Sequence, residues 1–226
     1  MNLIPLNNPV WHALNSHHQH LAIQGEVAVR YQPGIFAATA MPEYSSAGFN
    51  DLRSLVEANE IIGIMGLLPE GISGWEILQI DHVRQLVYED LKPATQVDVV
   101  VLTAEDVPEI LDLVNLTQPG PFLPRTIEMG QYLGVRQDGH LVAMAGERLH
   151  LTGFCEISAV CTYPDYRQRG YAGALTTMVA EGILERQETP FLHIAYGNEG
   201  ALRLYMKLGF RIRKEVPVAI LKKLAE

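Results

Sequence analysis

The alternation of apolar and polar positions is most regular in the second half of the chain. From residue 97 onward it predicts strands and helices in turn, with an Asp-Gly pair at the turn of a hairpin. The predicted elements are a strand at 97–102, a helix behind the N-cap Thr103, hairpin strands at 132–136 and 141–151, a strand at 154–162, a helix at 170–186, a strand at 191–196, a helix at 199–208 and a last strand at 216–221. This order indicates an α+β fold, a central mixed sheet flanked by helices.

The first 95 residues give weaker signals. Their predicted elements are a short helix at 51–58, a buried strand at 61–68 and a segment of ambiguous pattern at 75–88. The tetrapeptide Lys-Pro-Ala-Thr at 92–95 is typical of a linker. We therefore expect a smaller α/β domain over 1–95 and a second domain over 96–226.

Composition excludes several classes of function. The net charge of −9 disfavours a grip on the phosphate backbone of a nucleic acid. The sequence holds no apolar run of about 18 residues and shows no secretory signal, so we expect neither a membrane span nor export. The two cysteines, Cys155 and Cys161, are too far apart on one strand for a disulfide. A cytoplasmic setting fits these features.

The segment 157–175 has the pattern of an anion site. A strand leads into a basic loop, and small residues then open an amphipathic helix. The first N–H groups of a helix lack internal partners and lie at the positive end of its dipole, so a pyrophosphate fits there. Neither a nucleotide P-loop nor a Rossmann glycine pattern is present. The alternative interpretation is a plain helix start with solvated arginines.

A second motif, Asn198-Glu199-Gly200-Ala201-Leu202-Arg203-Leu204-Tyr205 followed by Gly209-Phe210, comes after the next strand. Asn198 and Tyr205 are about two helical turns apart and share one helix face. The two motifs together resemble the GCN5-related N-acetyltransferase (GNAT) superfamily. The resemblance covers 97–226, and the run from Glu156 to Leu221 is most similar to the FR47-like branch, which includes the catalytic half of glycine N-acyltransferase.

This resemblance implies acetyl-CoA as co-substrate and no metal. The strand implied to pair with the pantetheine arm holds Ala159, Val160, Cys161 and Thr162, with an amide near Val160 polarising the thioester carbonyl. Asn198 is implied to bind the pantetheine arm, and it is also a natural helix N-cap. The implied pyrophosphate loop comprises Arg167, Gln168, Arg169, Gly170, Tyr171, Ala172 and Gly173.

The implied reaction is direct attack of a primary amine on the thioester. Tyr205 matches the family tyrosine that protonates the departing thiolate, although a packed aromatic is the alternative. Glu156 stands at the offset of the catalytic glutamate of the histone acetyltransferases in this superfamily. Desolvation in an apolar strand would raise its pKa and suit a general base. One alternative is that Glu156 is a strand-end residue facing solvent. Another is that Glu147 is the base, although Arg148 beside it also suits a structural ion pair. A third is that the reaction uses no dedicated base.

Other features receive plainer interpretations. Cys161 is expected to pack rather than to act as a nucleophile. His12, His17, His18 and His20 are expected in an exposed loop rather than in a metal site. The N-terminal part could form a wall of the acceptor cleft, a dimerisation module that makes a homodimer, or a degenerate copy of the acetyltransferase fold.

The sequence predicts a small-molecule amine acceptor, with cationic amines favoured by the acidic balance. It leaves open the acceptor itself and an acyl group longer than acetyl. The alternative functions are a catalytically silent acyl-CoA sensor and an interaction module that keeps the fold.

Overall fold

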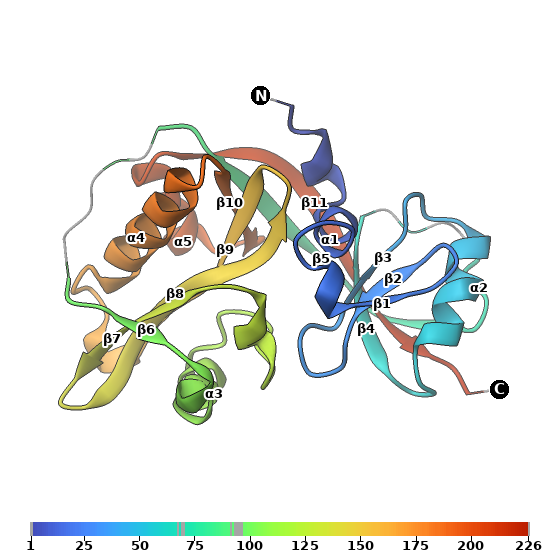
Figure 1. Ribbon diagram of the computed structural model, residues 1–226, viewed down its shortest axis with the longest axis horizontal. Coiled ribbons are helices and arrows are strands. Elements are labelled where there is room, and N and C mark those ends of the chain that lie inside the picture. Colours follow the sequence, from blue (N-terminus) through green and yellow to red (C-terminus); the bar gives the residue numbers. More distant parts are fainter. Residues whose placement is uncertain (1, 67, 69–70, 91, 93–96, 226) are drawn as a thin grey trace.

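The chain forms one curled, mixed sheet with helices on both faces (Figure 1). The computed structural model describes residues 2–66, 68, 71–90, 92 and 97–225. The sheet has 11 strands in the order β1-β2-β3-β4-β11-β5-β10-β9-β8-β7-β6. These strands are β1 (Ala22–Gln24), β2 (Val29–Tyr31), β3 (Ala38–Ala40), β4 (Ile61–Met65), β5 (Trp75–Tyr88), β6 (Val100–Leu102), β7 (Tyr132–Gln137), β8 (His140–Leu151), β9 (Phe154–Thr162), β10 (Thr189–Ala195) and β11 (Phe210–Lys223).

The helices divide between the two halves of the sheet. They are α1 (Pro9–Leu14), α2 (Ser46–Leu55), α3 (Val107–Thr117), α4 (Tyr171–Glu185) and α5 (Glu199–Lys207), with short 3-10 turns η1 (Ile4–Asn7), η2 (Gln19–Leu21), η3 (Ala104–Asp106), η4 (Thr126–Met129) and η5 (Pro164–Tyr166). From β6 to β11 the order of strands and helices confirms the predicted α+β fold. None of the described helices is long and apolar enough to cross a membrane.

Local sequence explains most element boundaries. Thr103 and Asp106 form a capping box before α3, and Asp138 and Gly139 adopt the positive φ values that a tight hairpin turn requires. The helix predicted at 51–58 lies earlier, at Ser46–Leu55, because the Ser45 hydroxyl accepts the amide of Gly48 and starts it.

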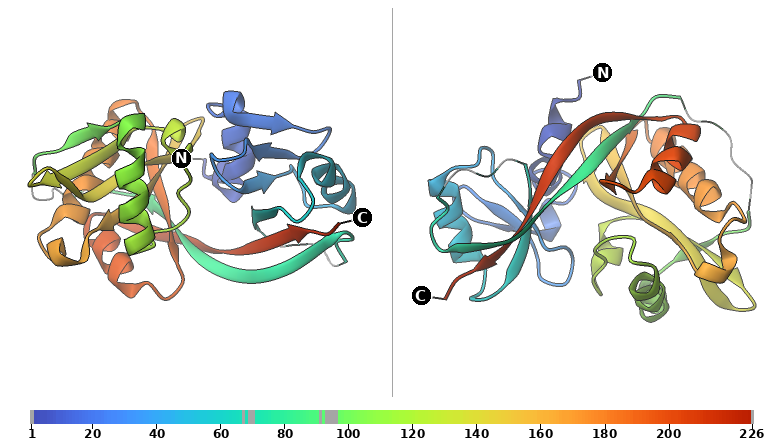
Figure 2. Two further views of the ribbon diagram at one scale, coloured as in Figure 1. Left: turned by 90° about the horizontal axis from the view of Figure 1, so that it is seen from below. Right: turned by 180° about the vertical axis from the view of Figure 1, so that it is seen from behind.

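Strands β5 and β11 connect the two lobes. They pair antiparallel over almost their full length and run as a ribbon from one lobe to the other (Figure 2). The ambiguous segment 75–88 is thus a single strand, and the last strand extends well beyond the predicted 216–221. Many side chains of the ribbon are exposed on both sides, so its residues lack the apolar alternation that marks a half-buried strand.

The first 90 residues are built into the sheet of the second half. β5 lies between β10 and β11, and the N-terminal core, with Leu6 and Tyr31, shares one cluster with Leu149 and Phe191. The boundary predicted near residue 95 falls among 93–96, which lie outside the described residues. Separate clusters pack α4 and α5 on one face of the second half and α3 on the other.

Candidate functional site

Strands β9 and β10 separate partway along their length. They pair in parallel from Phe154–Thr189 to Ile157–Leu192, yet β9 continues to Thr162 and β10 to Ala195. The backbone of β9 beyond Ile157 is therefore unpaired on the side that faces β10. This opening leaves room for an extended ligand to add its own hydrogen bonds to the strand.

A bulge in β9 stands at this opening. Ala159 has a φ of 54°, which is unusual for a residue with a side chain. The register with β8 advances from Gly146–Ser158 to Met144–Cys161, so β9 carries one extra residue there. Such bulges end strand pairing and redirect backbone groups next to active sites. The predicted residues Ala159 and Val160 thus lie where the strand is distorted.

The loop after β9 exposes unpaired amides. Gln168 and Gly170 adopt left-handed conformations, with φ of 63° and 84°, and Gly170 begins α4 without a side-chain cap. The first amides of α4, from Tyr171 to Gly173, consequently have no helical partner. Two exposed arginines flank this turn; Arg167 contacts the carbonyl of Thr162 at 3.4 Å. Positive charge and free N–H groups together make this turn suited to an anion.

Helix α5 and its N-cap hold the two residues predicted to act on the pantetheine arm and on the departing thiolate. Asn198 is exposed, and its side-chain oxygen accepts the Ala201 amide at 3.1 Å, which makes it the N-cap. Tyr205 is only 7% exposed and packs edge-on against Phe210. Burial, with a smaller effect of Cys161 at the end of β9, raises the pKa of the Tyr205 hydroxyl. That hydroxyl is therefore protonated at neutral pH, as a proton donor must be.

Glu156 differs from the sequence expectation. It is fully buried, neither in an unpaired apolar setting nor on the solvent face. Arg148 donates two hydrogen bonds to its carboxylate, at 2.7 and 2.9 Å, and His193 lies 2.7 Å from it. Although burial acts to raise the pKa, these partners lower it to about 2. The expected raised pKa is therefore wrong.

The alternative base, Glu147, is also held by an arginine. Arg186, and not Arg148, pairs with it at 2.9 Å. Neighbouring residues on a strand point to opposite faces, so Arg148 turns away from Glu147 and toward Glu156 on the adjacent strand. The ion pair expected between Glu147 and Arg148 is thus wrong, and both candidate carboxylates are engaged by guanidinium groups.

The remaining sequence candidates also take definite positions. Burial raises the pKa of the Cys161 thiol to about 11, so this sulfur is protonated at neutral pH. The histidine tract is not simply an exposed loop. His18 is buried, and its ring nitrogens lie 2.8 Å from the Tyr31 hydroxyl and 2.9 Å from the Met129 carbonyl.

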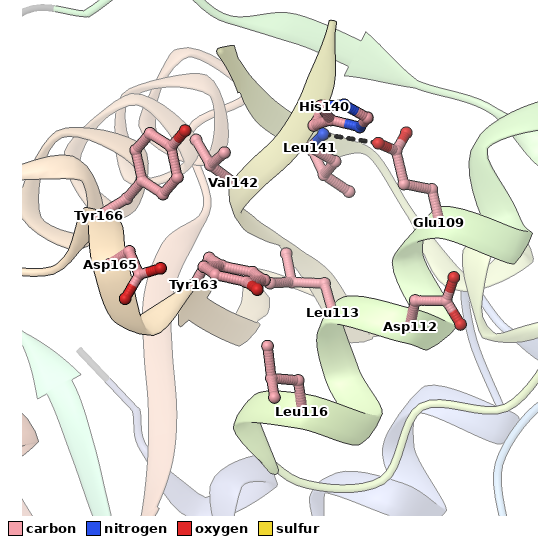
Figure 3. A pocket seen from close by; sticks show the side chains of 10 residues that line it. All are labelled: Glu109, Asp112, Leu113, Leu116, His140, Leu141, Val142, Tyr163, Asp165 and Tyr166. Carbon is pink, nitrogen blue, oxygen red and sulfur yellow. Dashed lines mark hydrogen bonds between the residues drawn. The ribbon is translucent and has the colours of Figure 1, made fainter. Parts of the chain in front are cut away.

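A groove of about 620 Å³ adjoins the loop after β9, and sequence reasoning missed it (Figure 3). It lies between α3, the start of β8 and the η5 turn, and three carboxylates line it, those of Glu109, Asp112 and Asp165. Glu109 is occupied, because it accepts the Leu141 amide at 2.6 Å. Arg136 also pairs with Glu109, at 2.7 Å, so Asp112 and Asp165 are the carboxylates that make this groove less suited to a phosphate than the amide-rich turn beside it. The sequence signal for this groove was weak, because acidic residues at helical spacing, such as those on α3, are also typical of a solvent-exposed helix face.

Comparison with known proteins places this geometry in a family. The chain is 33% identical to a GNAT-family protein from Novosphingobium aromaticivorans, with 98% of this chain and 99% of that chain covered and a TM-score of 0.88. The chain belongs to the GNAT family. Residues 132–217 match the family model described as FR47-like protein. No curated protein matches significantly.

More distant GNAT structures share the fold. A GCN5-related N-acetyltransferase from Kribbella flavida is 16% identical, covers 95% of this chain and 96% of its own, and has a TM-score of 0.62. A GCN5-related N-acetyltransferase-like protein from Streptococcus suis is 17% identical over 95% and 92%, with a TM-score of 0.55. In this GNAT chain, all the predicted cofactor residues lie inside the FR47-like match. The match to the Novosphingobium protein covers 98% of this chain, so it also includes most of residues 1–90.

Proposed function

We propose that the protein is an N-acetyltransferase that transfers the acetyl group of acetyl-CoA to a primary amine of a small molecule. One observation carries this proposal. The opening between β9 and β10, with its bulge at Ala159, leads directly to the uncapped N-terminus of α4. An extended chain that ends in a pyrophosphate matches both features at once.

The residues present fit this co-substrate. The amides from Gln168 to Gly173 would bind the pyrophosphate, with Arg167 and Arg169 adding charge. The unpaired backbone of Ala159 to Thr162 would hydrogen-bond the pantetheine arm. Acetyl-CoA supplies an activated thioester when bound.

The chain's own groups then assist the transfer. The Val160 amide would polarise the thioester carbonyl. The amine nitrogen forms a bond to the carbonyl carbon while the carbon–sulfur bond breaks. Tyr205 donates its hydroxyl proton to the departing sulfur and regains a proton from solvent, and the amine proton leaves to water. The net charge of −9 favours encounter with a cationic acceptor.

Removal of the amine proton is assigned to water because the candidate carboxylates are poor bases. A carboxylate with a pKa of about 2, such as Glu156, holds a proton weakly at neutral pH. Glu147 is buried against Arg186. The proposal therefore requires that the reacting amine itself be neutral in the site, so the positive charge of a cationic acceptor lies on another of its groups.

Two measurements test the proposal. Calorimetry should show micromolar binding of acetyl-CoA that is lost with a pantetheine fragment lacking the pyrophosphate. The substitution Tyr205→Phe should lower kcat by about 10²-fold or more and leave the acetyl-CoA affinity unchanged. Tyr88→Phe is the matched control, because Tyr88 packs against the same core cluster and has no role in the proposed transfer.

The outcomes separate the alternatives. Unchanged turnover in Tyr205→Phe refutes the acid role. Tight binding without CoA release in a broad amine screen indicates an acyl-CoA sensor instead. Absence of binding at near-millimolar ligand refutes both.

A further inference from the structure

Three metal-ligating side chains meet on the molecule away from the β9–β10 opening. His17 follows α1, His150 is near the end of β8, and Glu188 directly precedes β10. One potential ligand atom of each lies within 4.8 Å of the others. The two imidazole rings are stacked in parallel with centroids 4.0 Å apart, and His150 Nε2 lies 2.6 Å from Glu188 Oε1. Segments far apart in sequence thus converge on one point.

Surrounding contacts hold the backbone that carries His17 and the carboxylate of Glu188. His18 uses both ring nitrogens, on Tyr31 and on Met129, and so anchors the backbone that carries His17. The second oxygen of Glu188 accepts a hydrogen bond from Arg186 at 3.1 Å. Arg186 also pairs with Glu147, which offsets its positive charge. Outer partners of this kind orient metal ligands.

His17 is the unused donor of the cluster, because His150 Nε2 and Glu188 Oε1 are already hydrogen-bonded to each other. Among the residues that the structure describes, His17 makes no side-chain hydrogen bond or ion pair, and its ring stacks on that of His150. His17 is exposed, while the side chains of His150 and Glu188 are 20% and 11% exposed. A cation can reach this cluster from solvent, where it would replace the hydrogen bond between His150 and Glu188. The exposed His17 ring would turn out of the parallel stack so that its nitrogen points at the ion, and water can complete the shell.

We propose that His17, His150 and Glu188 bind a divalent transition metal of the zinc class. Two imidazole nitrogens and one carboxylate oxygen form a donor set that suits Zn²⁺, with water as the fourth ligand. The site lies at the start of β9, where His150 pairs with Cys155, whereas the proposed cofactor opening lies beyond Ile157. The metal would tie the N-terminal segment to β8 and β10, a structural role that is independent of acetyl transfer.

The test is zinc binding to tag-free, full-length protein. Calorimetry with ZnCl₂ should show one saturable site, and CoCl₂ should give the visible absorption of a tetrahedral site that zinc abolishes. His17→Ala, which changes an exposed side chain, and Glu188→Gln should each weaken zinc binding by at least about 10-fold. Zinc should raise the Tm of the wild type in proportion to the logarithm of its concentration and leave the Tm of His17→Ala unchanged.

His20→Ala is the matched control, since His20 is an exposed histidine three residues away and outside the cluster. It should bind zinc as the wild type does. Lack of saturable binding by the wild type overturns the proposal. Equal weakening in His20→Ala, or unchanged binding in His17→Ala, also overturns it because the ligands would then be others. Acetyl-CoA binding is not used in any arm, so failure here leaves the proposed function standing.

Discussion

The buried pair of Glu156 and Arg148 gives the sharpest test of the structure. Glu156→Gln keeps the side-chain volume but removes the charge that Arg148 and His193 face. Arg148 would then be a nearly buried guanidinium without its counter-ion, and breaking one side of such a pair costs about 3–5 kcal/mol. The lowered pKa of Glu156 has the matching direction, because Arg148 and His193 stabilise the charged carboxylate against the effect of burial.

Urea unfolding followed by tryptophan fluorescence measures this loss. Glu128→Gln is the control, because its pair with Arg125 is exposed and solvent-screened, and the urea midpoint should hardly move. Replacing both partners, as Arg148→Met with Glu156→Leu, should recover part of the stability, since no unpaired charge remains. A loss below about 1 kcal/mol in Glu156→Gln would refute the assigned burial and pairing.

The pH dependence has a definite sign. Because the folded-state pKa of Glu156 is depressed, its contribution is complete above the ordinary pKa of 4.5 and is lost as the pH falls toward about 2. The wild type should therefore lose more stability than Glu156→Gln over this acidic range.

The same variant separates a structural role from a catalytic one. Corrected for the folded fraction, Glu156→Gln should retain acetyl transfer within about 10-fold, whereas removal of a general base lowers rates by about 10²–10⁴-fold. A loss of that larger size in folded protein would show that Glu156 acts as the base after all.

Two further predictions concern packing and capping. Gly146→Ala should destabilise the fold by about 1–3 kcal/mol, because a Cβ there would stand 2.2 Å from the ring of the fully buried Tyr132. Gly182→Ala lies in open space on α4 and should stabilise the fold by about 0.5–1 kcal/mol. Thermal unfolding of both variants checks this contrast, and equal changes in stability would contradict it. Asn198→Ala should lose about 1 kcal/mol of stability, because the helix loses its N-cap. Asn198→Ser should restore that stability but not the affinity for acetyl-CoA, because a serine lacks the amide that we propose binds the pantetheine arm. Calorimetry measures the affinity, and full affinity in Asn198→Ser would show that Asn198 serves only as the helix cap.

The sequence by itself determined the local parts of this protein. The turn that we propose binds the pyrophosphate depends on consecutive residues, because a left-handed Gly170 and the first amides of α4 are set by a few neighbouring dihedral angles. The pattern after residue 97 likewise predicted the order of elements, since helices such as α3 and α5 bury one face and the central strands β8 and β10 are apolar runs buried on both faces.

Tertiary structure alone decided the charges and the long-range pairings. The pKa of Glu156 depends on Arg148 and His193, which come from two other strands, so the local apolar neighbours gave the wrong direction. Strand β5 is exposed over much of its length and is held to β11 by cross-strand hydrogen bonds. Backbone hydrogen bonds require no apolar alternation, so the pattern of residues 75–88 did not predict this strand. The cluster of His17, His150 and Glu188 is similar: only the sheet and the buried His18 bring these donors together, and no spacing along the chain records their proximity.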